Sequence, residues 1–402
     1  MIIGRDTTAL VDMQKKYKIA YVLTSVAYGG LETVAANFLQ AYNKEIFQII
    51  PVVMIRKDLE DNPFINMLNN VRYKYEKVYL SQNITNSLQH ASAIKKLYEI
   101  IYRIISKEAV DLIHSNGTLS DILTIPISVA TRIPSISTCH GLISTTRRLS
   151  FYNFMNRHVL RLASAVIAVS DSIRVDLERS GIKGENIKVI QNAIEVEENT
   201  EIKKKNRKDI RYEYGIDNDK FVIGYVGRLS TEKGVEHLIR AIPKVIEKCP
   251  KLTVVIIGEG PERKRLEELA RQLSVENCIM FPGFQSNVKA WLSAFDIFVL
   301  PSLMEGTPMA LLEAMAHGLP VIASYVGGIP GIIRSEENGI LIPAANEQEL
   351  ARAICNICEN ERLKNKLATE AKRTISENYD INDWTKKIEY EYLKLLIKDQ
   401  LN

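Results

Sequence analysis

The chain has 402 residues, more than one typical domain holds, and its 46% hydrophobic and 25% charged residues are ordinary for a globular protein. Its net charge of +4 is much smaller than the imbalance typical of nucleic-acid-binding proteins, and it suits anionic metabolites or an anionic membrane surface. No apolar run approaches the roughly 18 residues that a membrane-spanning helix requires. An integral membrane protein and a dedicated nucleic-acid-binding protein are therefore disfavoured.

The start of the chain predicts a strand and not a secretory signal. Residues 15–26, KKYKIAYVLTSV, superficially resemble a signal peptide, but their apolar core is short and runs directly into a turn and a helical pattern. We expect residues 1–17 to be a tail and Ile19–Thr24 to be the first strand.

Short apolar runs alternate with helical patterns along the whole chain, and the runs do not alternate between polar and apolar residues. Such strands, separated by helices, predict parallel sheets covered on both faces. The expected strands lie at 18–24, 47–55, 77–80, 110–115, 133–138, 164–170 and 187–190 in the first half, and at 221–227, 252–258, 278–283, 296–302, 319–324 and 339–343 in the second.

A charged segment at 195–219, poor in large aliphatic residues, marks a domain boundary. Its KKKNRK run, 203–208, favours a solvated linker or helix face over a nucleic-acid-binding patch. The predicted fold class is α/β, with two doubly wound, Rossmann-like parallel-sheet domains facing across a cleft. We expect an N-terminal domain at 1–190, a C-terminal domain at 191–375, and a last helix at 376–402 that packs on either domain.

The cysteines do not predict disulfides. Cys355 and Cys358 form a CxxC motif, but the motif lies inside a helical pattern, whereas a redox motif should follow a strand and a zinc site needs further ligands. We expect buried thiols in a reducing compartment.

Cations follow the first strand of the second domain. In GYVGRLSTEKG, 224–234, the strand ends at Gly227 and a helix opens near Lys233–Gly234, so Arg228 and Lys233 project from one loop. In an open parallel sheet, ligands bind beyond the carboxyl ends of the strands. A guanidinium and an ammonium beside a helix N-terminus suit a diphosphate, although a surface loop with two solvated cations is the alternative.

Glycines follow the next two strands. Gly258 and Gly260 precede a helix that is expected to start near Pro261, and Gly283 and Phe284 follow the third strand. Glycine permits close approach of the backbone, so these turns are candidate walls for a nucleobase.

Two glutamates bracket a helix start in the segment 301–324, PSLMEGTPMALLEAMAHGLPVIAS. The strand before it places Glu305 near the ligand, and the helix begins at Thr307–Pro308. We expect the free N–H groups of Met309, Ala310 and Leu311 to point towards Glu305. Two carboxylates beside a diphosphate would repel it unless they bind hydroxyl groups, so the residues predict a nucleotide-sugar. A paired structural role for Glu313 is the alternative.

The ordered motifs resemble the retaining glycosyltransferases of family 4, which have the two-domain GT-B fold. The resemblance extends over nearly the whole chain and rests on YGGLE, CHG, VIAVSDSI, VGRLSTEKG, GEGPER, FPGF, EGTPMALLEAMAHGLPVIAS and VGGIPGII. The E-x7-E spacing of Glu305 and Glu313 is weakly specific alone, but the ordered set is highly specific.

The resemblance implies roles for individual residues. Arg228 and Lys233 would bind the donor diphosphate and stabilise its leaving charge. Glu305 would hold the donor sugar, and Glu313 would accept hydrogen bonds from the ribose. His140 would approach the sugar from the N-terminal domain, although a satisfied polar residue at a strand end would be favoured without the family. The other expected donor-binding positions are Gly29, Gly30, Gly260, Phe284, Gly306, Thr307, Met309 and Ala310.

No metal and no cofactor are expected beyond the nucleotide-sugar itself, because the two cations do the work that a metal does elsewhere. The DND sequence at 217–219 resembles a metal-binding DxD, but it precedes a strand and is interpreted as a turn. Pro308 stands where many family members have Gly, which removes one N–H donor beside the sugar.

The expected activity is transfer of a hexose or N-acetylhexosamine, from a UDP-sugar by preference, to a glycan or lipid-linked acceptor in cell-envelope polysaccharide synthesis. The expected location is the cytoplasm. The helix at 145–162 carries Phe151, Phe154, Met155, Val159 and Leu162 beside Arg147, Arg148, Arg157 and Arg161. It either contacts the inner face of the plasma membrane or packs on the N-terminal sheet, and the second is preferred.

Three alternative functions make different demands on the sequence. A glycosidase would leave the cations without a purpose, and a nicotinamide-dependent oxidoreductase would need a GxGxxG motif after the first strand, where YGGLE lacks the third glycine. A non-catalytic nucleotide-sugar-binding module stays open, because a binding site alone does not establish turnover.

Overall fold

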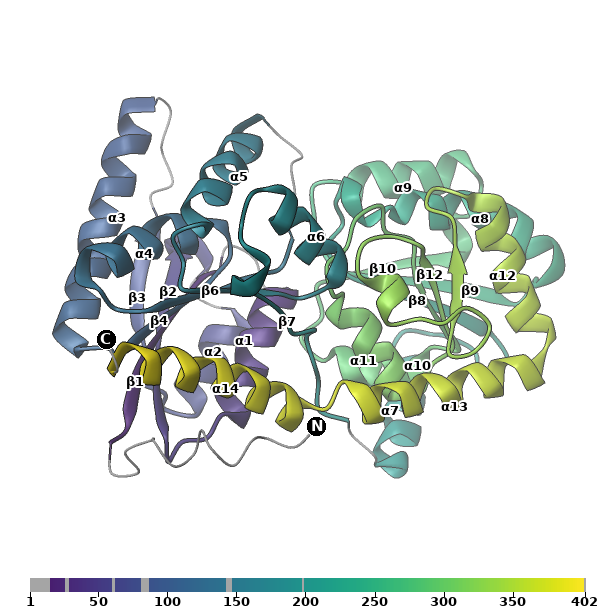
Figure 1. Cartoon of the computed structure of the whole chain (residues 1–402). Helices are drawn as coiled ribbons and strands as arrows, with labels where there is room; N and C mark the ends of the chain where they lie inside the picture. Colours follow the sequence, from purple (N-terminus) through teal and green to yellow (C-terminus); the bar gives the residue numbers. More distant parts are fainter. Residues whose placement is uncertain are drawn as a thin grey trace. The chain divides into compact units, whose positions relative to one another are not determined.

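The computed structural model describes residues 15–25, 29–59, 62–80, 87–141, 147–196 and 199–400. The chain forms two compact units (Figure 1), Met1–Asn192 together with Ile381–Asn402, and Ala193–Asp380. The chain first passes from one unit to the other after Asn192, two residues beyond the expected boundary at 190. The chain returns to the N-terminal unit after Asp380, so the last helix belongs to that unit. The expectation that the two units face each other across a cleft stays a prediction.

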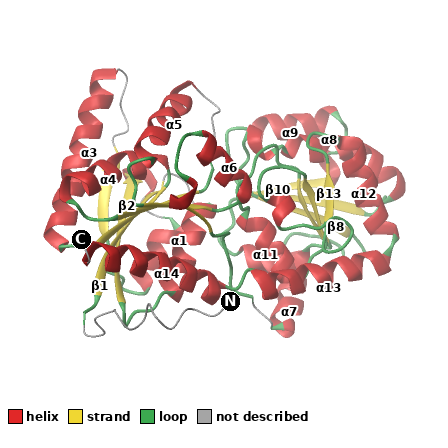
Figure 2. Cartoon of the chain, in the orientation of Figure 1, coloured by secondary structure: helices red, strands yellow, loops and turns green. Residues whose placement is uncertain are grey.

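In its described residues, the N-terminal unit has a seven-stranded parallel sheet with the order β3-β2-β1-β4-β5-β6-β7. Helices pack around the strands (Figure 2). The strands are β1 (Tyr17–Ser25), β2 (Phe47–Arg56), β3 (Glu76–Leu80), β4 (Leu112–Asn116), β5 (Ser135–Cys139), β6 (Ala165–Ala168) and β7 (Ile187–Val189). The helices are α1 (Gly30–Ala41), α2 (Pro63–Asn70), α3 (Ser87–Glu108), α4 (Thr118–Thr131), α5 (Arg147–Leu160), α6 (Asp171–Arg179) and α14 (Ile381–Gln400).

The C-terminal unit has a six-stranded parallel sheet with the order β10-β9-β8-β11-β12-β13. Its strands are β8 (Phe221–Val226), β9 (Leu252–Ile257), β10 (Ile279–Gly283), β11 (Ile297–Leu300), β12 (Val321–Ser324) and β13 (Ile340–Ile342). Its helices are α7 (Thr200–Glu213), α8 (Val235–Lys248), α9 (Arg263–Gln272), α10 (Val288–Ala294), α11 (Met309–His317), α12 (Glu347–Glu359) and α13 (Glu361–Asn378). The predicted fold class, two doubly wound parallel-sheet domains, is confirmed.

The strand register assigns side chains to the two faces of the N-terminal sheet. Tyr21 of β1 is paired with His114 of β4, so these side chains share one face. Phe38 of α1 stacks on Tyr21 there, with ring centroids 5.4 Å apart. Side chains of the opposite face bond to α4, where Asp121 Oδ1 accepts hydrogen bonds from Ser115 at 2.6 Å and Ser137 at 2.7 Å.

The last helix, α14, packs on the face that α1 covers (Figure 1, in yellow). Its Tyr392 hydroxyl lies 2.5 Å from His114 Nδ1, and Trp384 meets Phe38 edge to face at 5.9 Å. A buried hydrogen bond and aromatic contacts therefore hold a segment from the end of the chain against the first strands.

The charged run before β8 is not a solvated linker. It forms α7, which packs on α10 of the C-terminal unit. Arg211 is fully buried and donates hydrogen bonds to the Ala294 carbonyl and, at 2.8 Å, to the Asp296 carboxylate. Arg207 donates to the other oxygen of the same carboxylate at 2.8 Å. For the KKKNRK run, 203–208, the linker alternative is wrong and the helix-face alternative holds, since Lys204, Lys205 and Lys208 are exposed on α7.

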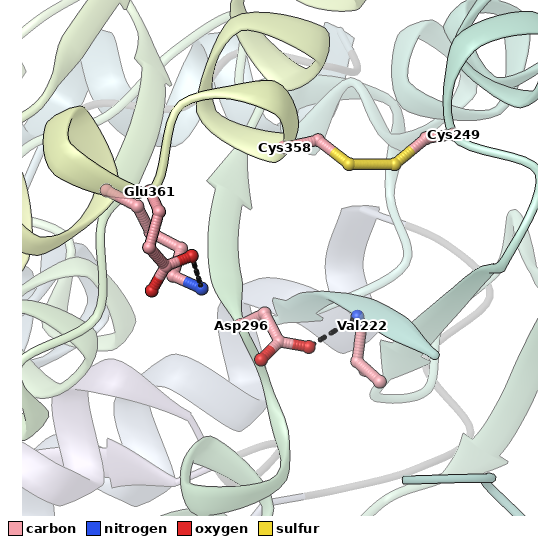
Figure 3. Close-up of a disulfide and its surroundings, with 6 residues drawn as sticks. Val222, Cys249, Asp296, Cys358 and Glu361 are labelled. Carbon is pink, nitrogen blue, oxygen red and sulfur yellow. Dashed lines mark hydrogen bonds and ion pairs between the residues drawn. A yellow bond between two sulfur atoms is a disulfide. The ribbon is translucent and has the colours of Figure 1, made fainter. Parts of the chain in front are cut away.

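The prediction of thiols without disulfides is wrong. Cys249, at the end of α8, is bonded to Cys358 near the end of α12, 109 residues later (Figure 3). The thiol prediction holds for Cys355, which is buried and free. The CxxC spacing places Cys355 and Cys358 one helical turn apart. Because α8 packs on α12, however, the partner of Cys358 is Cys249 from the other helix. Below this bond, Asp296 accepts a hydrogen bond from Val222 N–H at 2.7 Å (Figure 3).

Candidate active site

Loops at the carboxyl ends of the C-terminal strands pack tightly against one another. Gly234 has φ of +59°, and a Cβ there would lie 2.2 Å from the Pro301 carbonyl oxygen. Gly327 has φ of +54°, and a Cβ there would lie 1.8 Å from the Glu305 carbonyl oxygen. Only glycine fits at both positions. The loops after β8 and β12 are therefore fixed against the loop after β11, which carries Glu305.

Lys233 and Glu305 meet in this cluster. Lys233 Nζ donates to Glu305 Oε1 at 2.7 Å, and Ser302 Oγ donates to the same oxygen at 2.7 Å. The Glu305 side chain is only 6% exposed, which strengthens both bonds. Ser302 was not predicted as a site residue, and it lies two residues after the end of β11 at Leu300.

Arg228 lies on the same loop as Lys233 and is exposed. Its guanidinium has no ion-pair or hydrogen-bond partner among the residues that the structure describes. Its backbone is fixed, because the buried Tyr225 hydroxyl donates to the Arg228 carbonyl oxygen at 3.0 Å. The loop thus presents one unpaired cation and one cation that a carboxylate already holds.

Helix α11 begins two residues later than expected, at Met309, with Pro308 as its N-cap. The expectation of three free N–H groups is wrong for Leu311, whose N–H donates to the Pro308 carbonyl at 3.2 Å. The N–H groups of Met309 and Ala310 have no backbone acceptor within the described part of the chain. Gly306 precedes them and accepts a hydrogen bond from Gly328 N–H at 3.1 Å, and Thr307 is buried.

Glu313 lies in the second turn of α11 and is half-buried. Burial raises its pKa to about 7, and the positive charge of Lys289, at the start of α10, opposes this rise. Among the described residues, no hydrogen bond or ion pair connects Glu313 to the Lys233–Glu305 pair. Lys289 is a nearby cation that the sequence did not single out.

The expected nucleobase positions lie on two further loops. Gly260 approaches the backbone of the first loop, since a Cβ there would lie 2.1 Å from the Leu229 carbonyl oxygen. Helix α9 begins at Arg263, two residues after Pro261. Phe284 follows β10 and is 45% exposed.

In the N-terminal unit, His140 directly follows β5. Its Nε2 atom is buried and has no hydrogen-bond partner among the described residues. Burial lowers its pKa to about 4, so the ring is neutral near neutral pH. Gly29 and Gly30 are exposed at the start of α1, where Gly29 N–H donates to Glu32 Oε2 at 3.0 Å. A phosphate at this helix start would compete with that carboxylate.

The described residues hold no group of three or more His, Cys, Asp or Glu side chains that suits a metal ion. The DND segment forms a turn, as expected, and its Asp219 pairs with Lys251 at 2.5 Å.

The predicted amphipathic helix forms α5, and its apolar residues divide between two environments. Phe151 and Phe154 are each 60% exposed, whereas Val159 packs on the core of the N-terminal unit. Met155 is half-buried, Arg157 is exposed, and Leu162, which follows the helix, is 59% exposed. Arg161 bonds to the Ser180 carbonyl at 2.6 Å, and the predictions for Arg147 and Arg148 concern side chains outside the described ones. No described helix is both long and apolar enough to cross a membrane.

Two family models match this chain. Residues 28–198 match the model described as Glycosyltransferase Family 4, and residues 206–374 match the model described as Glycosyl transferases group 1. The two matches together cover most of both units.

Individual proteins are similar over most of their length. An Escherichia coli UDP-Gal:alpha-D-GlcNAc-diphosphoundecaprenol alpha-1,3-galactosyltransferase is 24% identical over 394 residues, 95% of this chain and 98% of that enzyme. The putative teichuronic acid biosynthesis glycosyltransferase TuaC of Bacillus subtilis is 28% identical over 287 residues, 70% of each chain. The structure of Anabaena HepE in complex with UDP-glucose superposes with a TM-score of 0.79 at 23% identity, covering 94% of this chain and all of that one.

Proposed function

The chain belongs to the group 1 glycosyltransferases of GT-B fold, and from that premise we propose that it transfers a hexose or N-acetylhexosamine from a UDP-sugar, with retention of anomeric configuration. The acceptor is a glycan or a lipid-linked glycan of cell-envelope polysaccharide synthesis, and the location is cytoplasmic. Relatives named for an undecaprenol-linked acceptor and for teichuronic acid synthesis support this acceptor class, and a neighbour bound to UDP-glucose supports the donor class.

The observation that carries the proposal is the bond from Lys233 to Glu305, beside the loop of Arg228 and the start of α11. An ammonium group has three N–H donors, and Glu305 uses one, so the others suit diphosphate oxygens. Arg228 adds a guanidinium that has no partner within the described ranges of the chain. Glu305 Oε1 is occupied by Ser302 and Lys233, which leaves Oε2 for a sugar hydroxyl.

The chemistry of the proposed reaction is electrostatic. The bond from the anomeric carbon to the donor diphosphate breaks as the bond to the acceptor oxygen forms. Negative charge accumulates on the leaving diphosphate, which takes up the proton of the acceptor hydroxyl. Lys233, Arg228 and the N–H groups of Met309 and Ala310 stabilise that charge without a metal.

Substitution of the two cations tests this proposal. We expect Lys233→Ala and Arg228→Ala each to lower turnover by ~10²-fold or more, as for the loss of a transition-state donor. The measurement is incubation with a panel of labelled UDP-, GDP- and ADP-sugars, scored for hydrolysis and transfer.

Lys244→Ala, which removes an exposed cation of α8, serves as the control and should keep wild-type turnover. Near-normal kinetics in both site variants would refute the diphosphate role. A thermal shift without any turnover would instead identify a non-catalytic binding module, because a ligand at 100 times its Kd adds about 2.7 kcal/mol of stability.

Contact with an anionic membrane through α5 is part of the proposal, because Phe151 and Phe154 are exposed on a helix that carries an exposed arginine. We expect flotation with phosphatidylglycerol-containing vesicles, and loss of flotation in a Phe151→Ser/Phe154→Ser variant. Val129→Ser removes an exposed apolar side chain from α4 and should float as the wild type does. Wild-type protein that stays at the bottom of the gradient would exclude the membrane contact.

A further inference from the structure

A surface cavity of about 430 Å³ lies in the C-terminal unit, where the end of α11 meets one face of α13. Its volume is within the range of small-molecule sites. The residues that line it are Gly318, Ala368, Thr369, Lys372, Arg373 and Ser376. This lining, all of which the structure describes, offers two cations and two hydroxyl groups and no carboxylate. Gly318 caps the end of α11, whereas the Lys233–Glu305 pair lies beside its start.

The two helices leave this cavity open for local reasons. On α13 the lining residues lie at positions i, i+1, i+4, i+5 and i+8 from Ala368, which is one side of a helix. They border the buried stripe of Leu367, Ala371 and Ile375. Helix α11 ends at Gly318 with φ of +83°, and a Cβ there would meet no surrounding heavy atom within 4 Å. The turn at this glycine therefore leaves free space beside the face of α13.

Cations from three other helices lie near the end of α11. Lys203 of α7 donates from Nζ to the His317 carbonyl oxygen at 2.9 Å. The pKa of His317 is lowered to about 4, first by burial and then by the positive charges of three lysines. These are Lys203, Lys289 on α10 and Lys372 on α13, so all three ammonium groups lie near the imidazole ring. The packing of α7 on α10, of α10 on α11 and of α11 on α13 brings them together (Figure 1).

Carboxylates balance only part of this positive charge. Arg373 pairs with Glu370 at 2.6 Å and with Glu377 at 3.5 Å, so its own charge is neutralised on α13. The ammonium group of α10 also acts on the half-buried Glu313. The charges that shift the pKa of His317, however, are all positive. The electrostatic potential at the end of α11 is therefore positive.

Helix capping explains one of these cations. The carbonyl end of a helix carries partial negative charge, and Lys203 already compensates it in α11. The two further lysines repel Lys203 and each other, and an anion in the cavity would offset that repulsion. Ammonium groups are common partners of phosphate, whereas a neutral ligand would leave the repulsion in place.

We propose that this cavity binds the phosphate group of a small molecule, with Lys372 in direct contact and Lys203 and Lys289 contributing their charge. Thr369 and Ser376 donate to carbonyl oxygens of α13 at 2.9 and 3.0 Å, and rotation of these hydroxyl groups turns them towards a phosphate oxygen. This site does not depend on the function proposed above. The phosphate is free or belongs to a phosphorylated metabolite, and the experiment separates these sources.

The test follows the imidazole signals of the full chain by NMR at neutral pH. The probes are inorganic phosphate, glycerol 3-phosphate and glucose 6-phosphate, with glucose as the neutral control. The His317 signals, identified by their loss in His317→Gln, should shift and saturate with a phosphate probe. Lys372→Gln should weaken that binding about tenfold, because it removes the contacting charge. Lys372→Arg keeps the charge and should retain binding, which separates loss of binding from loss of folding.

Lys366→Gln is the matched control, because it removes an exposed lysine of the same helix and changes the net charge equally. This variant should bind the probes as the wild type does. Tighter binding of glycerol 3-phosphate or glucose 6-phosphate than of inorganic phosphate would identify a phosphorylated metabolite as the ligand. Equal affinities for the three probes would identify free phosphate as sufficient.

Three results would overturn the proposed phosphate site. His317 signals that do not move with any phosphate probe at millimolar concentration would mean that the cavity holds only water. Equal weakening in Lys372→Gln and Lys366→Gln would mean that net charge alone attracts phosphate. Binding that is lost in Lys233→Ala and persists in Lys372→Gln would assign the phosphate to the loop of Arg228 and Lys233, and would leave the function proposed above intact.

Discussion

At the scale of single residues, Glu305 is held by two donors of different kinds. Lys233 supplies charge and comes from the loop after β8, whereas Ser302 supplies a neutral hydroxyl three residues before Glu305 itself. Both contact Oε1, so the orientation of the carboxylate is fixed by geometry as well as by charge. Ser302 is fully buried and acts through Glu305, which makes it a positioning residue in the proposed reaction.

Removal of the Ser302 hydroxyl should therefore reduce turnover more than binding. We expect Ser302→Ala to lower kcat about tenfold, because Lys233 alone leaves Oε1 free to rotate, with little change in affinity for UDP. Steady-state kinetics and calorimetry with UDP measure the two effects, and Ser302→Thr should recover most of kcat. Ser324→Ala, which removes another buried hydroxyl of the same sheet, is the control. Equal losses in both alanine variants would show that Ser302 has only a packing role.

Some residues near the candidate site could be predicted from the sequence, and others could not. The spacing of Glu305 and the two cations predicted one site, and the structure brings Lys233 and Glu305 into direct contact. Lys289 and Ser302 carried no such signal, because their roles depend on neighbours from other loops. Glu32, inside the YGGLE motif, was visible in the sequence, but its burial was not.

At the scale of helices and strands, the charged composition of α7 did not show which of its cations are exposed and which are buried. Lys204, Lys205 and Lys208 of the KKKNRK run are exposed on α7, as a solvated helix face should be. Arg207 and Arg211 of the same helix instead share the two oxygens of Asp296, and Arg211 also donates to the carbonyls of Ala294, Asp217, Asn218 and Lys220. A guanidinium has five N–H donors, which lets one buried side chain fasten several loop ends.

Loss of that guanidinium should destabilise the C-terminal unit. We expect Arg211→Met to lower its free energy of unfolding by about 3 kcal/mol, because the substitution leaves buried carbonyl groups unsatisfied and weakens the pairing of Asp296. Lys208→Met, an exposed cation of the same helix, should change stability by less than about 0.5 kcal/mol. Urea unfolding of both variants measures the difference, and similar midpoints would contradict the fastening role.

At the scale of the whole molecule, buried carboxyl groups in both units have raised pKa values. Burial raises the pKa of Glu32 and of Glu313 to about 7 and that of Asp121 to about 6. A carboxyl whose pKa is raised by folding favours the folded state when protonated, so this stabilisation is lost as pH rises through the folded-state pKa. The buried His114 and the half-buried His140 and His317 have lowered pKa values, and they act in the opposite direction below about pH 6.5.

A difference measurement isolates Glu313 from the other groups. We expect the free energy of unfolding of Glu313→Gln, taken relative to that of the wild type, to rise by about 2 kcal/mol from pH 5 to pH 8. The reason is that only the wild type must bury a charge at the higher pH. Thermal unfolding at a series of pH values supplies both curves. Glu359 is an exposed residue of the same unit, and the curve of stability against pH for Glu359→Gln should be parallel to that of the wild type. A parallel curve for Glu313→Gln as well would refute the raised pKa of Glu313.

The sequence by itself determined the thirteen strand positions in the described residues, the division into two doubly wound domains, and the loops that carry Arg228, Lys233, Glu305 and Glu313. These follow from local patterns, since uninterrupted apolar runs predict buried parallel strands and each helix start is set within a few residues. Tertiary structure alone decided the bond between Cys249 and Cys358, the burial of Arg211, and the return of α14 to the first unit. Each of these joins residues from different elements, and such contacts depend on packing that no local pattern encodes.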